Sequence, residues 1–373
     1  MRSPKILFLA TEDWFYRSHF LALGRRAVEE GYEVVLAARD SGALASEPSV
    51  RFIPTTSQRR ALTPADLGRD VTWLRALLRA EKPDVIHAIA LKPIVQLLLA
   101  GSGGAGRVLA VTGRGYLAAR GAPWTKAMAA GVQILLNRAA AAPNTVLLVE
   151  NGHDARWALG RAARDGDRVV QMPGAGVDPD AFIVAPEPPA PIIVGVVARL
   201  IWSKGVDLAV GAVRRLQAEG RDVRLRIAGA PDPGNPETVP DTELARWRAE
   251  PGVELIGRID DASAFWAGAH IACLPSRGGE GLPRSLIEAA ACGRPCVTTD
   301  VPGCADFVRH DADGLVVPPE NAAALAEAIA GLADDAERRR RMGASARARV
   351  LGGYTIAHAA EQASRAWRLA RGA

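Results

Sequence analysis

Short runs of aliphatic residues alternate with longer segments of helical period along almost the whole chain. This alternation is typical of parallel sheets built from strand–helix–strand units. In the first half, the segments 17–30 and 65–80 carry their apolar residues at helical spacing. Around them, the pattern predicts strands over residues 6–10, 33–37, 50–53, 85–87, 108–111, 146–149 and 169–171. The first half is therefore expected to form a doubly wound α/β domain.

A proline-rich segment over residues 178–191 interrupts this pattern near the middle of the chain. Because proline lacks a backbone N–H and fixes φ, the segment can continue neither a helix nor a central strand, and we expect an extended linker. Strands are predicted again over 192–198, 224–228, 253–256, 271–274, 296–299 and 315–317. The chain of 373 residues is also longer than one core usually organises. We expect an N-terminal domain over 1–183 and a C-terminal domain over 184–354, with functional residues just after strands, beside a cleft between the sheet edges.

Composition and charge narrow the classes of protein. Apolar residues make up 49% of the chain and charged residues 23%, as in soluble globular proteins. The 46 Lys and Arg exceed the 41 Asp and Glu, but no basic stripe with interleaved aromatic residues indicates a nucleic-acid partner. Basic residues near apolar segments of the first half are compatible with peripheral contact to an anionic membrane. These are Arg59, Arg60, Arg114, Arg120, Lys126 and Arg138.

The cysteines and the apolar runs indicate in which cellular compartment the protein is expected. Cys273, Cys292, Cys296 and Cys304 match no common zinc spacing, which favours buried reduced thiols and a reducing cytoplasm. The apolar run at 6–10 is too short for a signal peptide. No stretch reaches the roughly 18 uncharged apolar residues that a membrane span needs. We therefore expect a cytoplasmic protein that does not cross a bilayer.

The segment 275–295 carries the strongest chemical signal. The predicted strand 271–274 is followed by a loop with three glycines, and Pro283 falls in the expected first turn of a helix. Free N–H groups at such a helix start, together with the positive end of its dipole, can bind a diphosphate that the glycines allow to approach closely.

Two carboxylates frame this helix start. Glu280 in the loop and Glu288 in the helix lie eight residues apart. This spacing corresponds to about two helical turns, so both can face one ligand from different depths. A carboxylate accepts two hydrogen bonds from a vicinal diol, so one would suit a sugar and the other a ribose. For Glu288, a cap or an ion pair on the helix face is the alternative.

Two cations, Arg199 and Lys204, come directly after the predicted strand 192–198. They can neutralise a diphosphate leaving group, Arg as a fork of donors and Lys as a point charge. A solvated surface is the usual explanation of isolated basic residues. This loop, however, lies on the side of the sheet where ligands bind.

Taken in order, these elements resemble family 4 of the retaining glycosyltransferases, which have the GT-B fold of two Rossmann-like doubly wound domains facing each other across a cleft. The match spans nearly the whole chain and keeps the order of the motifs. By this resemblance, the last helical stretch, 355–373, is expected to pack back on the first domain. The likeness is carried by Arg199, Lys204-Gly205, the pair Glu280 and Glu288, residues 174–178, Pro302-Gly303 and residues 313–318.

The resemblance also implies a role for each donor-site residue. Arg199, Lys204 and Glu280 form the catalytic set, in which the two cations hold the donor diphosphate and Glu280 engages the transferred sugar. Transfer occurs with retention, and the leaving diphosphate itself accepts the proton of the acceptor, so the enzyme mainly stabilises charge and positions groups. The other donor-binding positions are Gly257 and Arg258 near the nucleobase, Gly281 and Leu282 at the sugar and phosphate, and Glu288 at the ribose.

The first half resembles a narrower branch that extends polysaccharides or polyprenyl-diphosphate-linked sugar chains, on the strength of residues 11–19, 87–93 and 111–116. Many family members have a Gly-rich loop after the first strand and a His after the fourth. This chain has Glu12-Asp13-Trp14 and Thr112-Gly113 instead. The acceptor-side candidates are therefore Asp13, His19, His87 and Lys92.

Asp-x-Asp pairs, which bind divalent metals in other nucleotide-sugar enzymes, occur at 165–167, 178–180 and 311–313 in turn-prone contexts. Since the resembled fold neutralises phosphate with Arg and Lys, we expect no required metal or cofactor.

The expected function is transfer of a hexosyl or N-acetylhexosaminyl group from a nucleotide-diphosphate donor, with UDP as the nucleotide. The acceptor would be a hydroxyl of a glycan or of a lipid-linked saccharide in cell-surface polysaccharide biosynthesis. Two alternatives stay open at this point. One is a two-domain sugar-nucleotide epimerase, and the other is a non-catalytic glycan-binding protein with a vestigial donor site.

Overall fold

The computed structural model describes residues 2–45, 47–57, 63–115 and 123–372. The chain forms two compact units, each with its own parallel sheet. Unit 1 comprises Met1–Ala175 and Ile356–Ala373, and unit 2 comprises Gly176–Thr355. Three of the basic residues named above, Arg59, Arg60 and Arg120, lie outside the described residues.

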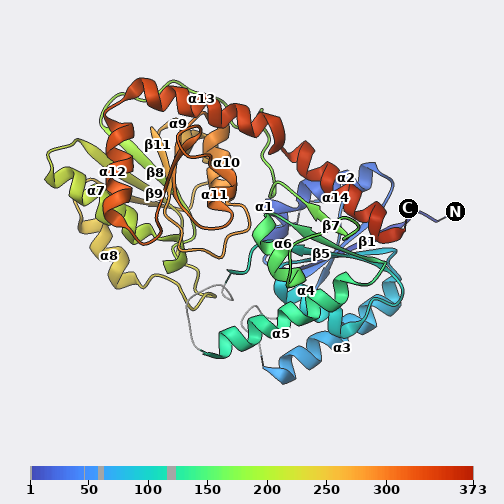
Figure 1. The fold of residues 1–373 in the computed structure, drawn as a ribbon. Coiled ribbons are helices and arrows are strands. Elements are labelled where there is room, and N and C mark those ends of the chain that lie inside the picture. The colour runs from blue at the N-terminus through green and yellow to red at the C-terminus, as the bar shows by residue number, and fades with distance from the viewer. Residues whose placement is uncertain (1, 46, 58–62, 116–122, 373) are drawn as a thin grey trace. The chain divides into compact units, whose positions relative to one another are not determined.

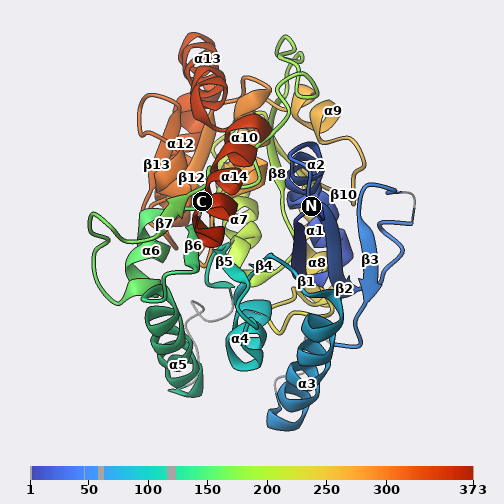
Figure 2. The same ribbon diagram turned by 90° about the vertical axis from the view of Figure 1, so that its right-hand side faces the viewer.

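Unit 1 is built on a seven-stranded sheet (Figure 1), whose strands follow the order β3-β2-β1-β4-β5-β6-β7 and are all labelled in Figure 2. Helices cover both faces, so most strands are buried on both sides and appear in the sequence as continuous apolar runs. All seven strands predicted for this half are confirmed, with ends that differ by at most two residues. The strands are β1 (Lys5–Glu12), β2 (Glu33–Arg39), β3 (Arg51–Pro54), β4 (Val85–Ile89), β5 (Gly106–Val111), β6 (Thr145–Val149) and β7 (Val169–Gln171).

Neighbouring residues of β1 show the two helical layers of unit 1, because successive side chains of a strand point to opposite faces. Phe8 packs in the layer that contains α1 (Asp13–His19), α2 (Leu21–Glu29) and the terminal helix α14 (Ile356–Arg371). Leu7 packs in the opposite layer, whose helices α3, α4 and α5 are seen together in Figure 2. That layer comprises α3 (Pro64–Glu81), α4 (Leu91–Ala100), α5 (Pro123–Ala140) and α6 (Gly152–Leu159).

The last helix belongs to unit 1 although the chain reaches it only after completing unit 2. α14 packs on α2, β5 and β6. Its Trp367 is fully buried, and the indole Nε1 donates a hydrogen bond of 3.0 Å to Nδ1 of His87.

Unit 2 is built on a six-stranded sheet in the order β10-β9-β8-β11-β12-β13. Its strands also agree with the prediction: β8 (Ile192–Val197), β9 (Val223–Ala228), β10 (Val253–Gly257), β11 (Ile271–Leu274), β12 (Cys296–Thr299) and β13 (Gly314–Val317). One face carries α7 (Val206–Ala218), α8 (Asp241–Ala249) and α12 (Ala322–Ala333). The other carries α9 (Ala262–Ala267), α10 (Arg284–Ala291) and α11 (Cys304–Phe307), and α13 (Ala336–Gly353) contributes to both cores. The four cysteines are buried and unbridged.

The proline-rich segment is an integral part of unit 2 and not a free linker. Arg347 donates a hydrogen bond of 3.0 Å to the carbonyl oxygen of Pro179, and Arg294 donates one of 3.0 Å to that of Ala185. Because proline has no backbone N–H, this segment cannot form a regular hydrogen-bonded ladder. Arginines of unit 2 instead donate hydrogen bonds to its carbonyl groups. The compact units divide between residues 175 and 176, and not at the predicted boundary of 183/184.

Each sheet reverses its strand order at one point, between β1 and β4 in unit 1 and between β8 and β11 in unit 2. At such a switch point the connections leave neighbouring strands toward opposite faces, and ligands bind beyond the carboxyl ends of those strands. In unit 2, the loop with Arg199 and Lys204 follows β8, and the glycine-rich loop follows β11. The topology therefore brings these two loops together.

Candidate functional site

Lys204 and Glu280 form a close ion pair at the switch point of unit 2. The Lys204 ammonium lies 2.6 Å from Oε1 and 2.7 Å from Oε2 of Glu280, and the hydroxyl of Ser276 lies 2.9 Å from Oε1. Only 16% of the Lys204 side chain and 11% of the Glu280 side chain are exposed. An ammonium has three N–H donors, so the pair leaves a donor for a further anion or hydroxyl.

A glycine lets the two loops approach closely enough for this pair to form. Gly205 follows Lys204 with φ of 67°, and a Cβ at this position would lie 1.9 Å from the carbonyl oxygen of Pro275. Both this backbone conformation and the lack of space disfavour any residue other than glycine.

Arg199 stands apart from that pair. Its Nη1 donates a hydrogen bond of 2.7 Å to Oδ2 of Asp232, in the connection after β9. The Arg199 side chain is 43% exposed and the Asp232 side chain 13%. The predicted second cation thus lies at the same edge of the sheet, but a carboxylate that was not predicted holds it.

Glu288 is buried within α10 and forms an ion pair with Arg284, whose Nε lies 2.8 Å from Oε1. Burial raises the pKa of Glu288, against the opposing effect of the Arg284 charge. Glu280 and Glu288 therefore have separate partners, and the structure shows the ion pair that was the alternative for Glu288.

The glycine-rich loop has a backbone conformation that only glycine adopts readily. Gly278 and Gly279 have φ of 121° and 81°. A Cβ on Gly303 would lie 2.2 Å from the carbonyl oxygen of Gly281, so the loop after β12 packs directly on this segment.

The other predicted donor-binding positions lie at the ends of elements. Leu282 is buried just before α10, and Pro283 is the N-cap of that helix and not part of its first turn. Gly257 is the last residue of β10, with φ of 78°, and Arg258 after it is exposed.

Asp13 is a structural carboxylate, which corrects the expectation that it faces an acceptor. It is fully buried and accepts hydrogen bonds from the backbone N–H groups of Trp14 (2.7 Å), Ser41 (2.9 Å) and Ala43 (3.1 Å) and from the Ser41 hydroxyl (2.5 Å). Burial alone would raise the pKa of Asp13, but these hydrogen bonds outweigh it and lower the pKa. Asp13 thus fastens the segment after β2 to the start of α1.

His87 is a core residue, which corrects the second acceptor-side expectation. It lies within β4, fully buried, with its ring centroid 5.0 Å from that of Phe8 and its Nδ1 bonded to Trp367. Burial lowers the pKa of His87 to about 3, so the ring is neutral. It has no access to an acceptor bound at the surface.

The two remaining candidates lie nearer the surface. The ring of His19 stacks on that of Phe15 with 4.4 Å between centroids, and its Nδ1 lies 2.6 Å from the Ser18 hydroxyl. Lys92 is in the first turn of α4, where its Nζ lies 3.6 Å from Oδ2 of Asp70. Lys92 is thereby the candidate that adjoins a pocket.

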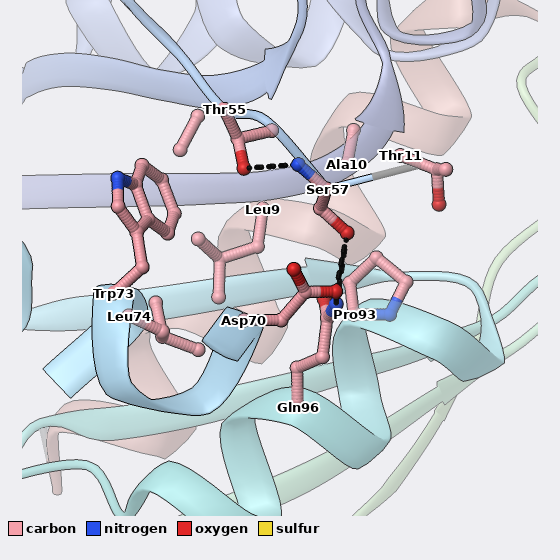
Figure 3. Close-up of a pocket in the computed structure, with 11 residues that line it drawn as sticks. Leu9, Ala10, Thr11, Thr55, Ser57, Asp70, Trp73, Leu74, Pro93 and Gln96 are labelled. Atoms are coloured by element: carbon pink, nitrogen blue, oxygen red, sulfur yellow. Dashed lines mark hydrogen bonds between the residues drawn. The ribbon is translucent and has the colours of Figure 1, made fainter. Parts of the chain in front are cut away.

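The pocket is lined by β1, β2, α3, α4 and the segment after β3 in unit 1, and it holds none of the donor-site candidates (Figure 3). Leu9 of β1 is part of its apolar wall, and Trp73 of α3 presents its ring beside it. Oδ2 of Asp70 accepts hydrogen bonds from Ser57 Oγ (2.6 Å) and Gln96 Nε2 (2.7 Å). The other carboxylate oxygen, Oδ1, accepts no hydrogen bond from the described residues, so it can accept one from a ligand.

Sequence reasoning missed three groups of residues. They are Asp232 beside Arg199, the Ser57–Asp70–Gln96 network, and the pair Arg277 and Asp207 described below. Arg277 stood within the glycine-rich segment and Asp207 directly after the lysine loop, but only the strand order shows that they meet.

Comparison with known protein families agrees with this architecture. A family model described as "Glycosyl transferases group 1" matches residues 191–335. A second, described as "Glycosyl transferase 4-like", matches residues 5–142. The two matches fall in different units and together span most of the chain. The chain belongs to the family 4 glycosyltransferases.

Curated relatives of this chain match over part of their length. A Streptomyces coelicolor exopolysaccharide phosphotransferase is 35% identical over 206 residues, covering 54% of this chain and 21% of the relative. An Escherichia coli glycosyltransferase assigned to colanic acid biosynthesis is 35% identical over 164 residues, covering 42% and 40%. A Campylobacter jejuni N,N'-diacetylbacillosaminyl-diphospho-undecaprenol alpha-1,3-N-acetylgalactosaminyltransferase is 29% identical over 147 residues, covering 39% and 37%. The matched segments thus span less than half of each relative.

Solved structures show that the chain has the GT-B fold. Sucrose-phosphate synthase from Thermosynechococcus elongatus superposes with a TM-score of 0.81 at 19% identity, covering 98% of both chains. Anabaena HepE in complex with UDP-glucose superposes with a TM-score of 0.76 at 18% identity, covering 97% of this chain and 98% of that one.

The helices were also compared with the length and polarity of a membrane span. Within the described ranges, none combines the length and the apolar character needed to cross a bilayer.

Proposed function

We propose that this protein transfers a sugar from a nucleoside-diphosphate donor, with UDP as the nucleotide, to a hydroxyl of a glycan or lipid-linked saccharide, with retention of configuration. The observation that carries the proposal is the Lys204–Glu280 pair at the switch point of unit 2. Fold relatives that were solved with UDP or UDP-glucose support the choice of nucleotide. Relatives named for colanic acid synthesis and for a diphospho-undecaprenol acceptor support the choice of acceptor.

Lys204 would act on the charge that develops during the reaction. As the bond between the sugar C1 and the diphosphate oxygen breaks, negative charge grows on the leaving group, and a preplaced ammonium stabilises it without reorganisation. The leaving oxygen then takes the proton of the acceptor hydroxyl, which attacks from the same face. Arg199 would add a second positive charge once the diphosphate replaces Asp232 as its partner. Glu280, already held by Ser276, would accept hydrogen bonds from the transferred sugar.

The remaining donor contacts follow from where the residues lie. Glu288 would accept hydrogen bonds from the ribose hydroxyls, in place of part of its ion pair with Arg284. Gly281 and Leu282 would offer their backbone to the sugar and phosphate before α10, and the Gly257-Arg258 turn would lie beside the base. This set relies on protein cations for phosphate neutralisation, so we propose that transfer requires no added metal or cofactor.

On the acceptor side, we propose the pocket of unit 1. The open Oδ1 of Asp70 would accept a hydrogen bond from an acceptor hydroxyl, while the Trp73 ring offers an apolar face to a sugar. Lys92, whose Nζ lies 3.6 Å from Oδ2 of Asp70, would hold the carboxylate in place from the α4 side. A carboxylate at this place favours a neutral saccharide unit over a phosphorylated one.

The Asp70→Asn variant is expected to raise the KM for the acceptor about tenfold, with little change in donor hydrolysis in the absence of acceptor. An amide is a weaker acceptor than a carboxylate, and a hydrogen bond to a charged group is worth about 1.5–3 kcal/mol. The measurement is a pair of initial-rate series, one over acceptor concentration and one over donor concentration. Asp165→Asn, at an exposed turn of the same unit, is the control. An unchanged acceptor KM would remove the pocket from the acceptor site.

The experiment that tests the proposed function starts from a screen of UDP-, GDP- and ADP-sugars for thermal stabilisation, since a ligand of the native state raises its apparent stability. The donor that stabilises is then incubated with lipid-linked and free saccharides in the presence of EDTA. We expect release of UDP together with a product of retained anomeric configuration by NMR. An isomerised nucleotide sugar without UDP release would show an epimerase, and glycan binding without turnover of any donor would show a binding protein.

The same proposal places the protein in the cytoplasm, in peripheral contact with the membrane that holds a lipid-linked acceptor. Lys126 and Arg138 are exposed on α5 of unit 1, where they can meet anionic headgroups. Sedimentation with phosphatidylglycerol vesicles, but not with phosphatidylcholine vesicles, is the expected result at low salt. Equal recovery with both would exclude this electrostatic contact.

A further inference from the structure

The turn that carries Lys204 is held from outside by one arginine of the glycine-rich loop. Nη1 and Nη2 of Arg277 donate hydrogen bonds of 2.8 Å and 2.7 Å to Oδ1 and Oδ2 of Asp207. Asp207 lies in the first turn of α7, three residues after Lys204. A two-pronged contact of this kind fixes direction as well as distance. It joins the element after β8 to the loop after β11.

Arg277 also binds the backbone just before Lys204. Its Nη1 donates a hydrogen bond of 2.6 Å to the carbonyl oxygen of Trp202, and its own N–H donates one of 2.7 Å to that of Ser203. Both carbonyls belong to the 3-10 turn η2 (Trp202–Lys204), whose last residue is Lys204. So short a turn has few internal hydrogen bonds, and those have poor geometry. Its orientation therefore depends on contacts from outside the turn. Arg277 supplies two of them, and the others are a hydrogen bond of 3.2 Å from the Ser276 hydroxyl to the Ser203 carbonyl oxygen and one of 2.8 Å from the Trp202 N–H to the Glu237 carbonyl oxygen.

The guanidinium of Arg277 already forms an ion pair within the protein. Both terminal nitrogens are bonded to Asp207, and 24% of the Arg277 side chain is exposed. Among the described residues, Lys204 keeps one N–H without a partner and Arg199 makes one hydrogen bond, to Asp232, so Arg277 differs from both. These contacts favour a role in positioning Lys204 over a role in binding phosphate.

We infer that Arg277, together with Asp207, is a positioning residue that fixes η2 so that Lys204 faces the β-phosphate of the donor. This inference rests on the proposed function, because it assigns Lys204 to the diphosphate. Lysine cannot replace Arg277, since an ammonium offers a point charge and not a planar fork that reaches a carboxylate and a carbonyl together. Asparagine in place of Asp207 keeps the size of the side chain but offers one acceptor where two are used.

The test compares UDP with UMP, which differ by the β-phosphate. In Arg277→Lys and Asp207→Asn, we expect the Kd for UDP to rise at least tenfold and the Kd for UMP to change less than twofold, both by calorimetry. In a Lys204→Ala background, the same substitutions should have no further effect on UDP, because the residue that they position is gone. In donor titrations, the two variants should raise the KM for the nucleotide sugar and lower kcat.

Arg224→Lys is the matched control, because Arg224 lies on β9 with 57% of its side chain exposed, and its Nε is 3.8 Å from Oδ1 of Asp222. The unfolding midpoint is measured for Arg277→Lys and for the nearly isosteric Asp207→Asn. These midpoints show whether the two variants are folded under the conditions of the binding assay. Equal loss of UDP and UMP binding, or a loss that persists in the Lys204→Ala background, overturns the inference alone. A wild type that binds no nucleoside diphosphate overturns the proposed function, and this inference with it.

Discussion

Replacement of Lys204 by alanine is expected to lower kcat/KM for sugar transfer by about 10²–10³-fold, the loss typical of removing one preplaced donor from a developing negative charge. Lys204 lies 2.6 Å from Glu280 with little exposure to water, and residues 176–355 contain no second lysine that could replace its charge. The measurement is initial rate over a range of donor concentrations. A variant within threefold of wild type would contradict the role given to Lys204.

The variant has a second effect that must be separated from catalysis. Without Lys204, Glu280 is a poorly solvated carboxylate with Ser276 as its remaining partner, and an unpaired buried charge destabilises a fold. The double variant Lys204→Ala/Glu280→Gln removes that charge, so it should recover stability without recovering transfer. Lys126→Ala, at an exposed position of α5, should change neither. Recovery of transfer in the double variant would mean that Lys204 only neutralises Glu280.

The strands could be predicted because of how parallel sheets are covered. With helices on both faces, as around β6, every residue of a strand is buried, so a short continuous apolar run marks it. What the pattern could not give was where the helical segment 17–30 divides. The backbone at Phe20 leaves helical geometry, with φ of −126°, and its ring is buried in the core that α1 and α2 share. A buried aromatic residue fits the apolar period of one continuous helix, so the period alone does not reveal the break.

The candidate site was predicted only as far as the chain order allowed. Lys204 and Glu280 each followed a strand, but their contact across 76 residues depends on β8 lying beside β11, which the hydrophobic pattern does not encode. Position after a strand was a weaker guide for Asp13 and His87. Both are fully buried, since Asp13 satisfies neighbouring N–H groups and His87 still lies inside its strand. Adjacency to a strand end gives the edge of the sheet, and burial decides whether a ligand can reach it.

Gly205→Ala is expected to destabilise unit 2 by about 2–5 kcal/mol and to lower transfer at least a hundredfold. The new Cβ would lie 1.9 Å from the carbonyl oxygen of Pro275, and φ of 67° is itself unfavourable for alanine by about 1–2 kcal/mol. Relief of the clash requires the two loops to separate, and overpacking of this kind costs about 1–3 kcal/mol more. Separation moves Lys204 away from Glu280, so activity should fall further than stability alone explains. The measurements are denaturant unfolding and initial transfer rates.

Gly211→Ala is the matched control, because Gly211 lies within α7 in open space, with no atom within 4 Å of the added Cβ. Alanine is favoured over glycine inside a helix by about 0.5–1 kcal/mol, so this variant should be slightly more stable than wild type and equally active. The two variants make the same chemical change six residues apart in the sequence. Their opposite effects would therefore report on the contact between the loops after β8 and β11. A Gly205→Ala protein as stable and active as Gly211→Ala would show that these loops can separate without cost, and that the placement of Lys204 does not depend on their contact.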